Sequence, residues 1–191
     1  FGLDALQSGL ITFVSAAGAL IMKTLARTIL ARFGFRRVLT VNAVIGAAFL
    51  AASGLFTPTT PHAIILSVLL VGGCFRSLQF TGINALSYAD VSNREMSSAT
   101  SMSSVAQQLS LSIGVTIGAF ALETTHFLHG GKTLGAGDFW PAFLIVGLIS
   151  ASSVFWMMQL APDAGAEVSG HVPVSARKVT AEAIAEQKPL D

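Results

Sequence analysis

The chain has 191 residues, of which 52% are hydrophobic and only 11% are charged, and its formal net charge is +1. Soluble domains carry about 25% charged residues, so this composition predicts an integral membrane protein and excludes an ordinary soluble enzyme. No basic tract with interleaved aromatic residues is present, and nucleic acid is therefore not expected as a partner.

The expected fold is an all-α membrane protein built as a bundle of about five transmembrane helices. A helix of ~20 apolar residues crosses a bilayer, and five segments of the chain approach that length. The expected spans are residues 6–24, 38–56, 63–88, 97–122 and 140–160. They form one domain over residues 1–160, with the lipid bilayer as its first partner. Residues 161–191 are polar, and we expect a disordered tail there.

The first span opens at Asp4, which with Gln7 resembles a capping box. Small residues in its middle favour close contact with another helix. The loop R-F-G-F-R-R, Arg32 to Arg37, is expected to follow the span directly. The second span contains almost nothing polar after Asn42, so we expect it to face lipid. Two prolines then break the chain between Thr57 and His62.

The third span carries an arginine near its middle, roughly 20 Å from either end. A cation at that depth costs about 2.5 kcal/mol or more unless it faces protein or water. At ~100° per residue, the polar side chains near Arg76 share one broad face of the helix. The candidates for a substrate cavity on this face are Arg76, Gln79, Phe80, Ile83 and Asn84. The alternative is that Arg76 pairs with a neighbouring helix and only holds the bundle together.

The fourth span is rich in small and polar residues and follows a second capping box, Ser92 to Glu95. The candidates for helix packing or for an interface are Ser101, Ser104, Gln107, Gln108, Gly114 and Gly118. The last two form a GxxxG pattern, which lets two helix backbones approach closely. Packing alone explains this surface, and a direct role of Gln107 or Gln108 in a cavity is the alternative.

The segment after the fourth span contains His126 and His129, three residues apart. No cysteine or nearby set of carboxylates completes a metal site, so no metal and no other cofactor is expected. No nucleophile constellation for an enzyme is found either. The last span is apolar all round, so we expect it to face lipid like the second span, with Trp140 and Trp156 as interfacial anchors.

The eleven Lys and Arg residues are sharply divided between the two sides of such a bundle. With five spans, nine of them fall on the side of the C-terminus, Lys132 falls on the other side, and Arg76 lies within the membrane. The positive-inside rule then places the C-terminus in the cytoplasm. Because the first residue would then lie outside, we expect the chain to be the C-terminal part of something longer.

Two stretches of the sequence resemble the major facilitator superfamily. The loop R-F-G-F-R-R is similar to its arginine–glycine loop. The runs F-R-S-L-Q-F-T-G-I-N-A-L-S-Y-A-D and S-S-A-T-S-M-S-S-V-A-Q-Q-L-S-L-S-I-G-V resemble its fourteen-span drug/proton antiporter branch. The resemblance covers roughly residues 1–160 and identifies the chain as the C-terminal part of such a multidrug efflux transporter.

The resemblance implies five spans of a C-terminal half in a bacterial inner membrane. It also implies a small-molecule substrate, possible proton coupling, and a missing N-terminal half as partner. Arg32, Gly34, Arg36 and Arg37 would form a cytoplasmic clamp in the family loop. However, Arg27 and Ala31 stand where the family carries glycine and aspartate, and topology-setting charge alone is the alternative role.

No acidic residue falls in the middle of a span, so a proton carrier is expected only in the missing part. A structural or accessory membrane subunit, or an inactive truncated fragment, is the alternative to a transporter.

Overall fold

The computed structural model describes residues 4–57, 59–128 and 136–170. All regular structure in these ranges is helical. The helices are α1 (Ala5–Phe33), α2 (Phe35–Ser53), α3 (His62–Ser87), α4 (Met96–Leu128), α5 (Ala136–Met158) and the short α6 (Ala166–Ser169). The first five are long and apolar enough to cross a membrane. The predicted all-α membrane fold is thereby confirmed.

The first helix extends further than expected and the second begins earlier than expected, because the loop between them is missing. Gly34 alone separates α1 from α2, and its φ of 75° is a left-handed conformation that glycine adopts without steric cost. Its N–H donates to the Leu30 carbonyl at 2.9 Å, and its own carbonyl accepts from the Val38 N–H at 3.2 Å. The expected loop from Arg32 to Arg37 is therefore helical on both sides of one glycine.

The start of the fourth span also differs from the capping-box expectation. The Ser92 hydroxyl donates to the Glu95 carboxylate at 2.6 Å. Residues 93–95 form a turn, and α4 begins only at Met96. The pair therefore stabilises the turn before the helix and does not form its first turn.

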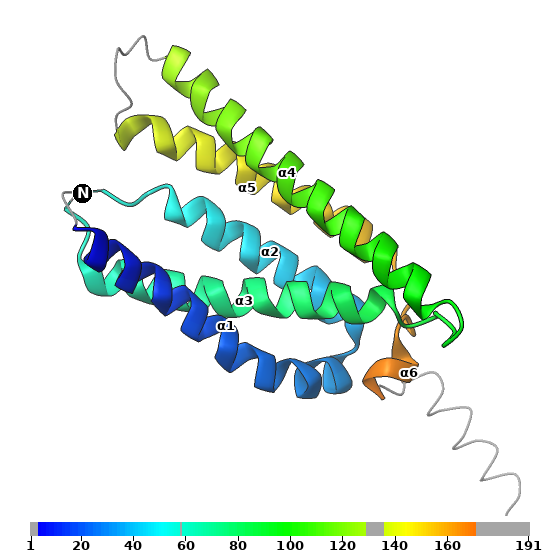
Figure 1. Ribbon diagram of the computed structural model, residues 1–191. Helices are drawn as coiled ribbons and strands as arrows, with labels where there is room; N and C mark the ends of the chain where they lie inside the picture. Colours follow the sequence, from blue (N-terminus) through cyan, green and yellow to red (C-terminus); the bar gives the residue numbers. More distant parts are fainter. Residues whose placement is uncertain (1–3, 58, 129–135, 171–191) are drawn as a thin grey trace, which may run out of the picture.

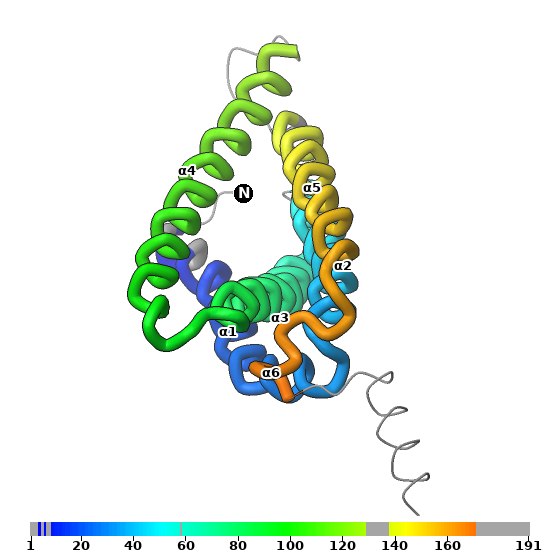
Figure 2. The backbone as a smooth tube through the Cα atoms, turned by 90° about the vertical axis from the view of Figure 1, so that its right-hand side faces the viewer, coloured from blue at the N-terminus to red at the C-terminus, as the bar shows by residue number. Residues whose placement is uncertain are grey.

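Neighbouring helices in space follow the order α1, α3, α2, α5, α4. Figure 1 shows α1, α2 and α3 side by side, with α4 and α5 as a second pair. In the view of Figure 2, α4 diverges from α1 and α3 beyond the α3–α4 connection and approaches α5 at its far end. The two helices at the ends of this spatial order, α1 and α4, each leave a long face without a described neighbour.

The tightest helix contact is the crossing of α1 and α3. A methyl group added at Gly18 would overlap the Leu70 carbonyl oxygen, and one added at Gly73 would overlap the Ser15 carbonyl oxygen. At this close approach the Ser77 hydroxyl donates to the Ala19 carbonyl at 2.9 Å. The small residues expected to favour close contact in the first span therefore do so against α3.

The most buried side chains gather at one end of the bundle, which we call the basic end. It holds the Gly34 turn, the α3–α4 connection and α6. Phe35 and Leu39 are 1% and 0% exposed there, and Leu30 and Leu78 pack into the same cluster. A methyl group at Gly165, just before α6, would meet the Phe35 ring at 2.6 Å. The beginning of the expected disordered tail is thus folded against the bundle; residues 171–191 lie outside the described residues.

Candidate functional site

A polar cavity of about 240 Å³ lies between α1, α2, α3 and α5. Its polar lining comes from four helices and comprises Ser15, Asn42, Ser53, Arg76, Gln79, Ser150 and Ser153. The rest of its wall is formed by apolar or small residues, mainly of α2 and α3. None of the described acidic side chains lines it, so the described lining carries the formal positive charge of one arginine.

Asn42 forms the inner wall of this cavity and is 3% exposed. Its amide nitrogen Nδ2 donates to the Phe75 carbonyl at 2.8 Å and to Gln79 Oε1 at 2.7 Å. Its amide oxygen Oδ1 is buried and has no hydrogen-bond partner among the described residues. A buried acceptor without a donor costs about 1–3 kcal/mol, so the site favours a water molecule or a ligand donor at this oxygen.

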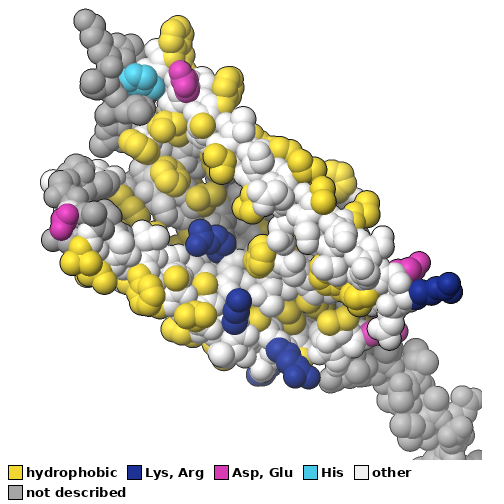
Figure 3. Space-filling view, in the orientation of Figure 1, with side chains coloured by type: hydrophobic (Ala, Val, Ile, Leu, Met, Phe, Trp, Pro, Cys, Tyr) yellow, Lys and Arg dark blue, Asp and Glu magenta, His cyan; other side chains and the backbone are white. Residues whose placement is uncertain are grey.

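Arg76 lines the same cavity and is exposed at its surface. Figure 3 shows a basic side chain in the hollow between the α1–α3 side of the molecule and the α4–α5 side. The Arg76 guanidinium Nη2 donates to Ser15 Oγ at 3.5 Å, a length at which a hydrogen bond is weak. No described carboxylate forms an ion pair with it. The structure therefore gives Arg76 no neighbouring-helix counter-ion within the described residues.

The five residues predicted to line a cavity do not all line the same cavity in the structure. Arg76 and Gln79 line the cavity, whereas Phe80 and Ile83 are 55% and 41% exposed and do not contribute to its wall. Asn84 lies further along α3, where its amide oxygen accepts a hydrogen bond from Gln107 of α4 at 3.1 Å. Among the described residues, that hydrogen bond joins one of the predicted α4 residues to α3.

The remaining predicted packing residues of α4 lie on its outer surface. Ser101 and Ser104 are exposed and donate to carbonyls of their own helix, and Gln108 is exposed. A methyl group at Gly114 or Gly118 would meet nothing within 4 Å. No described helix uses the GxxxG face, which remains a prediction for a partner beyond these residues.

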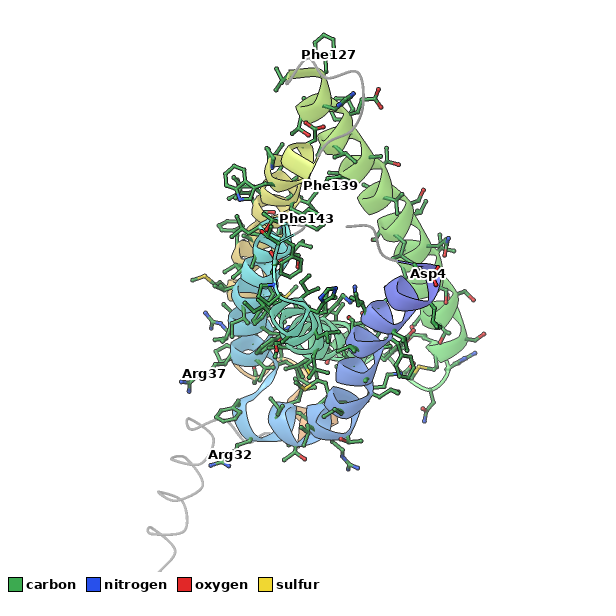
Figure 4. The ribbon with its side chains drawn as sticks, turned by 90° about the vertical axis from the view of Figure 1, so that its left-hand side faces the viewer. Asp4, Arg32, Arg37, Phe127, Phe139 and Phe143 are labelled. Atoms are coloured by element: carbon green, nitrogen blue, oxygen red, sulfur yellow. The ribbon has the colours of Figure 1, made fainter. Side chains whose placement is uncertain are left out.

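The predicted loop clamp is reduced to a cluster of arginines around one turn. Arg32 and Arg37 are exposed and Arg36 is half-buried, and Figure 4 shows Arg32 and Arg37 extending outward at the same end of the molecule. The Arg32 guanidinium lies 5.6 Å from the centre of the Phe33 ring. None of the three forms an ion pair with a described carboxylate, so the clamp remains untested.

The one ion pair among the described residues joins α4 to α5 at the end opposite the basic end. His126 Nδ1 lies 3.2 Å from Asp138 Oδ2, and the side chains are 25% and 8% exposed. The Thr125 hydroxyl donates to the Asp138 carbonyl at 2.9 Å. His129 lies outside the described residues. In the described ranges no group of three potential metal ligands occurs.

Sequence reasoning overlooked the contribution of α2 and α5 to the cavity. Both helices were expected to face lipid, yet Asn42 and Ser53 of α2 and Ser150 and Ser153 of α5 line it. The missed signal was a single amide in the middle of an apolar span, because polar residues within membrane helices almost always face protein or a wet cavity. Ser150 and Ser153 lie three residues apart and therefore share one face of α5.

Comparisons with known proteins agree with the resemblance in the sequence. The family model described as Major Facilitator Superfamily matches residues 1–187. Proteins named "Putative multidrug resistance protein MdtD" from Yersinia pestis (strain Pestoides F) and Yersinia pseudotuberculosis serotype O:1b (strain IP 31758) are 29% identical over 168 residues. These matches cover 86% of this chain and 36% of each relative. No solved structure matches the chain significantly. A match over nearly the whole sequence, together with the helical membrane fold, shows that the chain belongs to the major facilitator superfamily.

Proposed function

We propose that the chain forms the C-terminal part of a secondary active transporter of the fourteen-span drug/proton antiporter branch. The transporter exports drugs or small organic compounds across the bacterial inner membrane by alternating access, in exchange for protons. Family membership and the name of the MdtD relatives support this proposal. The observation that carries it is the open cavity beside Arg76, to which four helices of the membrane-spanning part contribute polar side chains.

The proposal requires further chain, because this chain spans 36% of the length of the matched relatives. The exposed faces of α1 and α4 are suited to contact an N-terminal half. Of 33 residues in α4, only Ala121 and Thr125 are buried. The described arginines outside the cavity cluster toward the basic end, and this supports a cytoplasmic position for that end and for the C-terminus.

The charge of the cavity restricts what it accepts. One guanidinium without a described carboxylate repels simple organic cations. Arg76 therefore either pairs with a carboxylate of the missing half or binds an anionic or zwitterionic group of the substrate. The serine and amide groups around it supply hydrogen bonds for a polar ligand or for water.

The experiment that tests this proposal replaces Arg76 with Ala in the full-length transporter. Drug efflux should be lost while the amount of protein in the membrane stays normal, since the cavity loses the one cation among its described lining residues. Arg94→Ala is the matched control, because Arg94 is an exposed arginine in the connection before α4. Resistance that is unchanged for all substrates in Arg76→Ala would rule out the cavity role.

A further inference from the structure

A second concave site lies on the outside of the bundle, between α1 and α2, and we call it the α1–α2 groove. It has a volume of about 410 Å³, within the range of small-molecule sites. Its wall is formed mainly by apolar side chains of three helices, among them Met22, Ile29, Phe33, Val41, Ile45 and Leu78, and its polar lining residues are Arg37 and Asn42. Phe33 and Val41 are 47% and 51% exposed, so the groove opens to the surroundings of the molecule.

The groove follows from the tight turn at Gly34. Two helices that leave one glycine diverge, and α1 contacts α3 far more extensively than it contacts α2. Phe75 and Leu78 of α3 cover only the inner floor of the space between them. The outer part of the groove therefore faces hydrocarbon when the helices span a membrane, and its apolar wall suits an acyl chain.

Arg37 stands at the end of the groove where a lipid headgroup would lie. It is the third residue of α2, and the 19 residues of that helix extend about 28 Å, close to the ~30 Å of a hydrocarbon core. Its side chain lines the groove, while its tip extends outward in Figure 4. An arginine with an apolar stem in a groove and its charge at the interface is the arrangement called snorkelling.

The arginine decides which lipid the groove prefers. Hydrocarbon surrounds the helices in any case, so one acyl chain gains little over another by entering the groove. A guanidinium binds a phosphate group through two parallel hydrogen bonds, and a neighbouring positive charge favours a lipid with net negative charge. Arg32 and Arg36 supply that charge within five residues of Arg37. None of the three forms an ion pair with a described carboxylate, although Asp163 and Glu167 belong to the same end.

We propose that the α1–α2 groove is a binding site for an anionic phospholipid, with one acyl chain along Val41 and Ile45 and the phosphate group on Arg37. The site lies on the other side of Asn42 and Phe75, which line both the groove and the cavity beside Arg76. It does not depend on the transport proposal, because it requires only that the helices span a bilayer. Bound lipid would fill the space between two helices that the turn at Gly34 holds apart.

Native mass spectrometry of the purified 191-residue chain tests this site. The chain is released from detergent micelles that contain equal amounts of phosphatidylglycerol and phosphatidylcholine. We expect the wild-type chain to retain phosphatidylglycerol roughly fivefold better, which corresponds to about 1 kcal/mol for one well-placed basic residue. Arg37→Gln should abolish this preference, and Val41→Trp, which fills the groove, should reduce the binding of both lipids.

Two control variants separate the groove from general surface effects. Arg94→Gln removes the same charge elsewhere at the basic end, and Val44→Trp adds the same ring at a position of α2 that is 52% exposed and outside the groove. Both should behave as wild type. Equal retention of the two lipids by the wild-type chain would overturn the proposal. So would an equal loss in Arg94→Gln and Arg37→Gln, or full phosphatidylglycerol retention in Val41→Trp.

Discussion

At the scale of single residues, Asn42 explains most about the interior of this protein. Its amide joins α2 to α3 through two hydrogen bonds from Nδ2. The amide oxygen Oδ1 has no hydrogen-bond partner among the described residues. In a membrane such a side chain is expensive unless it meets protein or water. Its position therefore fixes which face of α2 is turned inward.

Replacing Asn42 with Leu tests this bridge. The variant loses two interhelical hydrogen bonds, which average about 0.6 kcal/mol each in membrane proteins, and it removes a buried acceptor without a partner. Removal of the unpartnered acceptor offsets these two bonds, but Gln79 Oε1 loses its donor, which costs about 1–3 kcal/mol. We therefore expect a net loss of about 1 kcal/mol in the free energy of unfolding, measured by reversible SDS denaturation in mixed micelles. Val41→Leu, at an exposed position beside it, is the control. Wild-type stability of Asn42→Leu would contradict the role of the amide as a bridge.

The glycines provide a second prediction at this scale. Gly73→Ala places a methyl group into the Ser15 carbonyl at the α1–α3 crossing, and overpacking of this kind costs typically 1–3 kcal/mol. Gly114→Ala meets open space on α4 and should be neutral or stabilising by up to about 1 kcal/mol, because alanine favours helix. Thermal unfolding of the two variants in detergent compares these effects directly. Similar melting temperatures would show that the crossing is looser than described.

At the scale of whole helices, α4 differs from the others because its attachment is confined to a few residues. Ala121 and Thr125 are its buried positions, and Asp138 of α5 receives contacts from both Thr125 and His126. The Gln107–Asn84 hydrogen bond links it to α3. Most of α4 is thus held by its C-terminal turns. Substitutions in those turns should therefore destabilise α4 before they affect the other helices.

Asp138→Asn tests how α4 is held. The variant keeps the shape of the side chain but removes the charge that faces His126, and loss of such a buried partner costs roughly 1–3 kcal/mol. Hydrogen exchange of the backbone amides at the C-terminal end of α4 should become faster, while the α1–α3 amides stay protected. Glu123→Gln is the matched control, since Glu123 is exposed on the same turns of α4. Equal acceleration in both variants would show that the pair does not anchor the helix.

At the scale of the whole molecule, the helices form an open arrangement whose end members, α1 and α4, have exposed apolar faces. Leu10 and Phe13 on α1 and Val115 and Phe120 on α4 are all more than half exposed. Part of such surface faces lipid, where it carries no penalty. The cavity with Arg76 opens into the same hollow, so its environment depends on what the longer protein adds.

The isolated 191-residue chain should therefore not transport. No described acidic residue lines the cavity, and a guanidinium stays protonated at all physiological pH values, so the chain offers no proton-exchanging group at this site. The measurement is proton-driven drug uptake or efflux in liposomes that contain the purified chain. Coupled transport at rates above protein-free liposomes would contradict this prediction and would place the proton carrier within these residues.

The prediction from sequence succeeded where one physical signal dominates and failed where two helices had to be placed together. Hydrophobic length alone predicted five helices long enough to cross a membrane, because a single segment of ~20 apolar residues satisfies its backbone hydrogen bonds in lipid by forming a helix. The loop at Arg32–Arg37 was wrong, because charged residues mark the end of a hydrocarbon span and not the end of a helix. The lipid-facing expectation for α2 and α5 was wrong for the cavity face, since a few serines and one amide barely change the mean hydropathy of a helix.

By itself the sequence determined the fold class, the five spans, the family and the presence of a cation within the third span. These properties follow from the composition of the chain and the order of its residues, and each can be read from residues that are close together in the sequence. Only the tertiary structure decided that Asn42, Gln79 and Arg76 share one cavity, that Gln107 meets Asn84, and that the Gly34 turn leaves a groove beside Arg37. The physical reason is that helix rotation and helix pairing depend on close contacts such as the α1–α3 crossing, where two glycines and two carbonyl oxygens from distant parts of the chain must fit together.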